Sequence, residues 1–201
     1  MAKLEQVLDG VWRWSWYSEE KGMDFNGYAV RGPRGMVLID PVCAPDDAWA
    51  QLAGLGRPAE ILLTNKDHER ASDELRRRFS VSVAIHEADA PLLAVRPERT
   101  FKDGELCSGF LEAFRFRSLK SPGECAFLWR ERRLLFVGDA LAGRPPGGLG
   151  LVKKHDGRPG VLEELRALLS LDFSAILVGD GEPILKDGKE SLRLFLDGVR
   201  S

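Results

Sequence analysis

The chain has 201 residues, with 29 Lys and Arg against 31 Asp and Glu, a formal net charge of −2 and 44% hydrophobic residues. This balance excludes a strong overall field, so we expect neither nucleic acid nor a membrane surface as a partner. Cys43, Cys107 and Cys125 are widely spaced and form no CxxC pair. Together with an N-terminus that lacks a secretory signal pattern, they predict a soluble cytoplasmic protein. The length and apolar content predict a single domain over residues 1–201.

The first half of the chain predicts antiparallel strands followed by alternating strands and helices. Trp12, Trp14 and Trp16 alternate with polar residues, which is the period of a strand with one buried face. We expect this row in the core, with the lining of a crevice mouth as the alternative. The predicted strands cover 7–16, 26–32, 35–40, 59–64 and 82–86, and the predicted helices cover 46–56 and 71–79.

The second half repeats this order. Strands are expected over 109–119, 125–131, 132–141 and 174–181, and helices over 160–171 and 191–199. The Gly- and Pro-rich stretch 142–160 is predicted to be a long surface loop near the site. The two halves together predict an α/β (α+β) fold, a four-layer αββα sandwich in which two mixed β-sheets face each other and helices lie outside.

Polar residues follow four apolar strands, where side chains from different strands can converge on one crevice. The four segments are LLTNKDHER (62–70), SLKSPGECAF (118–127), LLFVGDAL (134–141) and ILVGDGEPI (176–184). Their order, together with the opening hairpin in NGYAV and GMVLIDPV, resembles the metallo-β-lactamase fold family of hydrolases over nearly the whole chain. The resemblance implies that fold, and a metal site at these strand ends.

Most metal-ligand positions that the resemblance implies hold other residues here. Read from Thr64, the family's histidine motif falls on Asn65, Asp67, Glu69 and Arg70, the later histidine on Glu124 and the last on Asp180. The family's bridging aspartate is retained as Asp139. A second register, with two residues deleted, aligns Asp67 and His68 with the motif's closing Asp–His pair, and the sequence leaves both registers open.

The histidine count excludes a histidine-rich two-zinc centre. A catalytic zinc ion takes about three protein ligands, and the chain has only His68, His86 and His155. We expect His86 and His155 to be surface or hydrogen-bonded side chains. The position of His68 leaves it open between that role and a role in the site.

A crevice of carboxylates remains, and such a cluster needs a cation or bound protons. Its members are Asp67, Glu69, Glu124, Asp139 and Asp180. One cation that suits the crevice is a hard divalent metal held by Asp67, Glu124, Asp139 and Asp180. The other is Arg70, which could pair bidentately with Asp139 or Asp180. We favour Arg70 and expect no metal cofactor.

Three functions follow from these alternatives. The favoured hypothesis is a catalytically altered homologue, a pseudoenzyme or small-molecule binder that lacks the classical two-zinc site. The second is a metal-dependent hydrolase with an oxygen-ligated Mg, Mn, Ca or single Zn ion, in which His68 or Asp67 acts as general base. The third is a non-catalytic interaction protein, since a fold does not fix a function.

Overall fold

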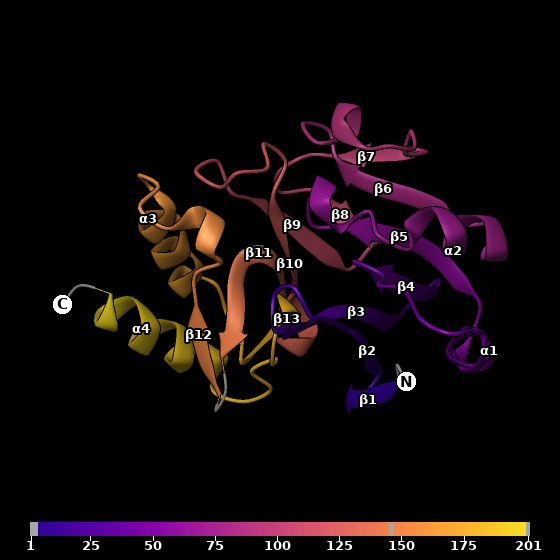
Figure 1. Ribbon diagram of the computed structural model, residues 1–201, viewed down its shortest axis with the longest axis horizontal. Coiled ribbons are helices and arrows are strands. Elements are labelled where there is room, and N and C mark those ends of the chain that lie inside the picture. The colour runs from indigo at the N-terminus through magenta and orange to yellow at the C-terminus, as the bar shows by residue number, and fades with distance from the viewer. Residues whose placement is uncertain (1–3, 145–146, 200–201) are drawn as a thin grey trace.

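The computed structural model describes residues 4–144 and 147–199, which form two β-sheets with helices on their outer faces (Figure 1). Met1–Lys3 and the two prolines of the expected 142–160 loop, Pro145 and Pro146, lie outside the described residues. In the parts of the chain that are described, no helix is long and apolar enough to cross a membrane.

The N-terminal sheet begins antiparallel and becomes parallel. Its strands are β1 (Glu5–Leu8), β2 (Val11–Ser18), β3 (Met23–Gly32), β4 (Gly35–Ile39), β5 (Pro58–Leu63), β6 (Ser82–His86) and β7 (Arg99–Phe101). Strands β1 to β4 pair antiparallel, and β4 to β7 pair parallel. Helix α1 (Asp46–Leu55) connects β4 to β5 and helix α2 (Ser72–Phe79) connects β5 to β6, which are the crossovers that parallel neighbours require.

The C-terminal sheet is mixed as well. Its strands are β8 (Leu106–Cys107), β9 (Leu111–Arg115), β10 (Cys125–Trp129), β11 (Leu134–Arg144), β12 (Gly148–Gly150) and β13 (Ala175–Asp180). Strands β11 and β13 are parallel, with helix α3 (Val161–Ala167) between them in the chain, and helix α4 (Gly188–Gly198) follows β13. The two sheets join where Asp180 of β13 pairs with Phe25 of β3.

Three apolar layers separate the four structural layers. Tyr28, Leu62 and Phe136 belong to the core between the two sheets. One outer core packs against α1 and α2 through residues such as Trp49, and the other packs against α3 and α4 through residues such as Leu192. Figure 1 shows α1 and α2 at one edge of the molecule, α3 and α4 at the other, and strands between. The predicted αββα sandwich is therefore confirmed.

The element boundaries differ from the prediction in several places. The strand expected over 7–16 is two strands, β1 and β2, because Gly10 has a φ of +69° and reverses the chain. Part of the expected 142–160 loop is strand β12, which pairs with the end of β11. Strands β7 and β8 have three and two residues, which is too short for a periodic pattern to show in the sequence.

The tryptophan row of β2 divides between core and surface. Trp14 is buried, packs edge-on against Trp49 with ring centroids 5.9 Å apart, and donates from Nε1 to the Val42 carbonyl at 2.8 Å. Trp12 is also buried. Trp16 is 51% exposed and packs on Phe25 at the edge of a cavity. Trp12 and Trp14 therefore lie in the core, as expected. Trp16 lies at the mouth of the crevice, as the alternative states.

Candidate functional site

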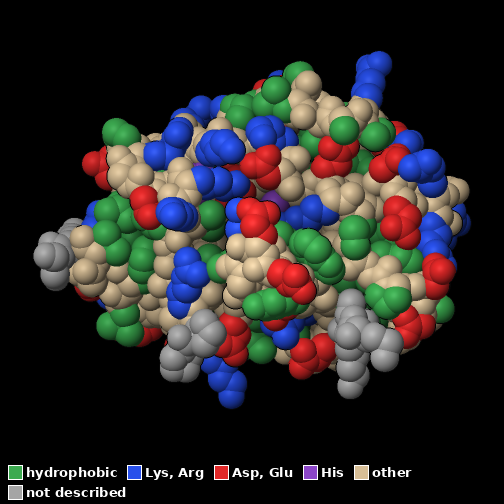
Figure 2. Space-filling view, viewed as in Figure 1, with side chains coloured by type: hydrophobic (Ala, Val, Ile, Leu, Met, Phe, Trp, Pro, Cys, Tyr) green, Lys and Arg blue, Asp and Glu red, His purple; other side chains and the backbone are tan. Residues whose placement is uncertain are grey.

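A cavity of about 1000 Å³ opens where the strands of both sheets end. His68, Asp139 and Asp180 contribute to its lining, together with Trp16 and Phe25. These residues follow β5, lie within β11, end β13 and belong to the β2–β3 hairpin, so both halves of the fold build the site. Figure 2 shows a small area of histidine near the middle of this face, with acidic side chains next to it and basic side chains gathered above it and to its left.

His68 is the innermost residue of the cluster, with its side chain 1% exposed. It ends a short 3-10 helix, Lys66–His68, whose N-cap is Asn65. Its Nδ1 lies 2.8 Å from Asp40 Oδ2, which also accepts a hydrogen bond of 2.6 Å from Thr64 Oγ1. Its Nε2 faces Asp139 Oδ1 at 3.4 Å and makes no hydrogen bond with any described residue. Asp40 therefore holds the ring at Nδ1, while Nε2 points toward Asp139.

The surrounding carboxylates decide the charge of His68. Burial and the nearby Arg70 guanidinium both disfavour the charged ring, but Asp40 and Asp139 outweigh them and raise the pKa of His68 to about 10. The ring is thus an imidazolium at neutral pH. In this state it is neither a metal ligand nor a general base.

Asp139 is the centre of the charge network. Burial opposes its ionisation, but His68 and Lys154 hold its pKa well below the usual range. Lys154 Nζ contacts Asp139 Oδ2, and Asn65 Nδ2 lies 3.4 Å from the same oxygen. The backbone N–H of Asp139 donates to Glu124 Oε1 at 2.9 Å. Asp139 is therefore ionised and paired with two cationic side chains.

Glu124 lies behind Asp139 and is fully buried. Burial, and then the charge of Asp139, raise the pKa of Glu124 well above its usual value. Burial and the neighbouring charge thus both disfavour an ionised carboxylate at Glu124. Glu124 thus supports the backbone of β11 from behind.

Arg70 pairs with Asp180, as one of the two sequence-based alternatives states. The contact is a single one, Nη2 to Oδ1 at 3.3 Å, and not the expected bidentate pair. The guanidinium lies 4.7 Å from the Phe25 ring centroid, and this stacking sets its orientation. Burial and the nearby Asp139 raise the pKa of Asp180, while His68 and Arg70 act in the opposite direction.

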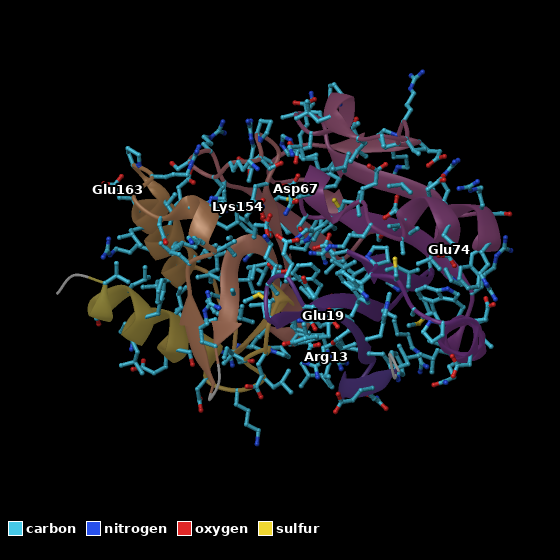
Figure 3. The ribbon with its side chains drawn as sticks, in the orientation of Figure 1. Arg13, Glu19, Asp67, Glu74, Lys154 and Glu163 are labelled. Atoms are coloured by element: carbon cyan, nitrogen blue, oxygen red, sulfur yellow. The ribbon has the colours of Figure 1, made fainter. Side chains whose placement is uncertain are left out.

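Lys154 is the second cation of the site. It belongs to the short 3-10 helix Lys153–His155 in the Gly-rich stretch after β12. Its ammonium contacts Asp139 and also Asp67 Oδ2, the latter at 3.1 Å, and Figure 3 shows Lys154 and Asp67 side by side between the two halves. Burial lowers the pKa of Lys154, but Asp139 and Asp67 outweigh it and the pKa is raised.

The other candidates lie at or beyond the margin of this cluster. Asp67 is at the cavity surface, where Lys66 and Lys154 hold its pKa below the usual value against the effect of burial. Glu69 lies outside the cluster, and its carboxylate accepts from the backbone N–H groups of Ala94 and Val95, each at 2.9 Å.

The two remaining histidines are buried away from the cavity lining. His86 accepts from the Ala88 N–H at 3.1 Å, which agrees with the expectation of a hydrogen-bonded side chain. The two ring nitrogens of His155 are buried and have no hydrogen-bond partner within the described ranges, which differs from that expectation. Burial lowers the pKa of both residues, so they are neutral at neutral pH.

Sequence reasoning missed Asp40 and Lys154. Asp40 follows strand β4 directly and has a φ of +47°, and a polar residue after an apolar strand was the available signal. No sequence feature indicated that Lys154 belongs to the site. A lysine next to another lysine in a glycine-rich stretch is usually a solvated side chain. Its role depends on how the chain after β12 returns to the cavity.

The donor set does not fit the two-zinc centre that the resemblance implies. Within the described residues, His68, Asp139 and Asp180 form a group whose ligand atoms lie within 4.8 Å of one another. Three donors suffice for one ion and not for two. Lys154 and Arg70 already neutralise both carboxylates. Two of the three donors in this group are therefore already paired with side-chain cations.

The fold and the position of this site define a member of one family. A family model described as the metallo-beta-lactamase superfamily matches residues 5–198. The chain belongs to that superfamily. No curated protein matches the sequence.

Solved structures share the fold at low sequence identity. A metallo-β-lactamase from Pontibacter korlensis superimposes with a TM-score of 0.80 at 17% identity, with 100% of both chains covered. An Erythrobacter litoralis metallo-β-lactamase with β-mercaptoethanol in its active site has a TM-score of 0.76 at 15% identity, covering 98% of this chain and 95% of that one. A third, from Hirschia baltica, has a TM-score of 0.72 at 14% identity and covers 95% and 97%. At such identities the likeness shows the fold alone.

Proposed function

We propose that this protein is a catalytically altered member of the superfamily that binds a small anionic molecule in the cavity without a metal ion. The observation that carries the proposal is the Lys154 ammonium between Asp67 and Asp139, where it neutralises carboxylates that would otherwise attract a cation. Arg70 does the same for Asp180. The cavity is kept while its metal chemistry is replaced.

The lining of the cavity favours an anion with an apolar part. Lys120, Arg144 and Lys153 line it and form no ion pair with any described residue. Their charges are thus available to a carboxylate, sulfonate or phosphate. Trp16 is exposed and packs on Phe25 with ring centroids 5.7 Å apart, which offers a flat apolar surface on the same cavity.

The residues of the site favour binding over hydrolysis. In metal-dependent relatives a bound ion would lower the pKa of a water molecule and generate the nucleophile. An ammonium and a guanidinium do not coordinate water in this way. His68, with a pKa raised to about 10, is already protonated at neutral pH, and the lowered pKa of Asp67 makes it a weak base. As part of this proposal we keep a cytoplasmic location and no nucleic-acid or membrane partner.

An amphiphilic fluorescent anion tests the proposal. Anilinonaphthalene sulfonate should bind the folded wild-type protein with saturable fluorescence. Charge reversal in Lys120→Glu/Lys153→Glu should weaken binding about tenfold or more, and Trp16→Ala should weaken it as well. Lys186→Glu, an exposed lysine outside the cavity lining, is the matched control. Equal affinity in the cavity variants and the control would contradict the proposal.

A metal-dependent hydrolase is the second candidate. It is favoured by one observation, the unpartnered Nε2 of His68 beside Asp139 and Asp180. Under the first proposal added Zn²⁺ neither raises the Tm nor creates esterase, thioesterase or lactamase activity. Zinc-dependent turnover that is lost in Asp139→Ala would establish the second candidate instead.

A further inference from the structure

We propose that the Lys154 ammonium is a tethered substitute for a metal ion, and that removing it uncovers a site for one divalent cation formed by His68, Asp139 and Asp180. The inference rests on the proposed function, in which the wild-type cavity works without metal. The new element is that three side chains able to bind a metal ion remain next to the Lys154 ammonium.

Asp139 is the residue that the ammonium and a metal ion would share. Its Oδ2 contacts Lys154 Nζ, and its Oδ1 lies 3.4 Å from His68 Nε2. The same ammonium is 3.1 Å from Asp67 Oδ2, so it lies among carboxylate oxygens as a bound cation would. A divalent ion near Asp139 would meet a like charge a few ångströms away, and this repulsion disfavours it.

His68 supplies an independent sign of a ligand position. Its side chain is 1% exposed, yet Nε2 makes no hydrogen bond with any residue in the described ranges and faces the cluster. The opposite nitrogen, Nδ1, is fixed by Asp40 at 2.8 Å. A histidine oriented by a carboxylate behind it is the usual arrangement of a metal-binding imidazole.

Asp180 completes the group from the other sheet. Arg70 engages it through one contact, to Oδ1, so the carboxylate is oriented and not enclosed. One imidazole nitrogen and two carboxylates within 4.8 Å suit Zn²⁺, Co²⁺ or Mn²⁺. Of the described Lys and Arg side chains, Lys154 is the one that pairs with Asp139, and its ammonium is therefore the blocking group.

Lys154→Met tests the inference, because methionine keeps much of the apolar stem and removes the charge. Zn²⁺ affinity is measured by calorimetry, and Co²⁺ is added as a probe whose visible absorption reports coordination. A mildly alkaline buffer is used because a metal ion displaces the proton of a coordinating imidazole. Lys153→Met is the matched control, since Lys153 lines the same cavity and pairs with no described carboxylate. Lys154→Arg, which keeps the charge, is the second control.

The expected result is Zn²⁺ affinity at least about tenfold higher in Lys154→Met than in the wild type and both controls. It is accompanied by a Co²⁺ absorption band that disappears in Lys154→Met/Asp139→Asn. Lys154→Gln should behave as Lys154→Met does. If folded Lys154→Met and Lys154→Gln bind Zn²⁺ no more tightly than the wild type, the inference is overturned. If these variants unfold without metal, failure of Zn²⁺ to restore their folded state overturns it as well. Tight binding by the wild type would instead contradict the proposed function.

Discussion

Asp40 organises the inner side of the site through three hydrogen bonds. Its carboxylate accepts from the Thr64 backbone N–H and hydroxyl at 2.8 and 2.6 Å and contacts His68 Nδ1 at 2.8 Å. All three residues are buried. Because a buried cation without its partner is costly, Asp40 holds both the position and the charge of His68.

Asp40→Ala should therefore lower the free energy of unfolding by about 3 kcal/mol or more. Urea unfolding of the variant beside wild type measures the loss, provided that the m-value is unchanged. Asp197→Ala, at an exposed position near the end of α4, should change stability by no more than about 0.5 kcal/mol. Equal effects of the two substitutions would show that the Asp40 network adds nothing to stability.

His68 predicts how stability depends on pH. Its pKa is about 10 in the folded protein against an ordinary value of 6.5. A raised folded-state pKa gives stabilisation that is complete below pH 6.5 and is lost as pH rises through about 10. Wild type should lose more unfolding free energy over this interval than His68→Gln, which lacks the titrating ring. Parallel stability curves for the two proteins would contradict the raised pKa.

At the scale of elements, β13 must lie close to the 3-10 helix that carries His68. Gly179 makes this approach feasible, because a Cβ at that position would come within 2.7 Å of His68 Cε1. The backbone of β13 packs against the His68 imidazole at Gly179, and the side chain of the next residue, Asp180, lines the cavity. A glycine before the last residue of the strand is thus a requirement of the site.

Gly179→Ala should destabilise the protein by about 1–3 kcal/mol through this overpacking. The matched control is Gly54→Ala in α1, where a Cβ meets nothing within 4 Å. There alanine should raise the unfolding free energy by about 0.5–1 kcal/mol because it restricts the unfolded chain and favours the helix. Thermal or urea unfolding distinguishes the two, and destabilisation by both alike would contradict the packing explanation.

For the whole molecule, the order of strands and helices was predictable from the sequence because apolar periodicity and glycine turns are local signals. The αββα arrangement followed from that order and from the resemblance. The short strands β7, β8 and β12 and the break at Gly10 escaped prediction, since two or three residues carry no period.

The candidate site was predictable only in part, because its interactions are long-range. The strand ends drew attention to His68, Asp139 and Asp180, which the structure brings together. Sequence analysis predicted Arg70 as the cation of the site. It did not predict Lys154, which pairs with Asp139, because the stretch around Lys154 has no local pattern that indicates a site. Glu69 is next to Arg70 in the chain, yet it bonds to backbone at 94–95, since adjacent residues in a loop face different ways.

We propose that side-chain cations replace the metal ions of the superfamily in this protein. It is tested most directly by elemental analysis, using plasma mass spectrometry, of untagged protein purified without added metal or chelator, beside Asp139→Ala. We expect no divalent metal near stoichiometric amounts in either protein. Near-stoichiometric zinc or manganese in the wild type that is lost in Asp139→Ala would contradict it.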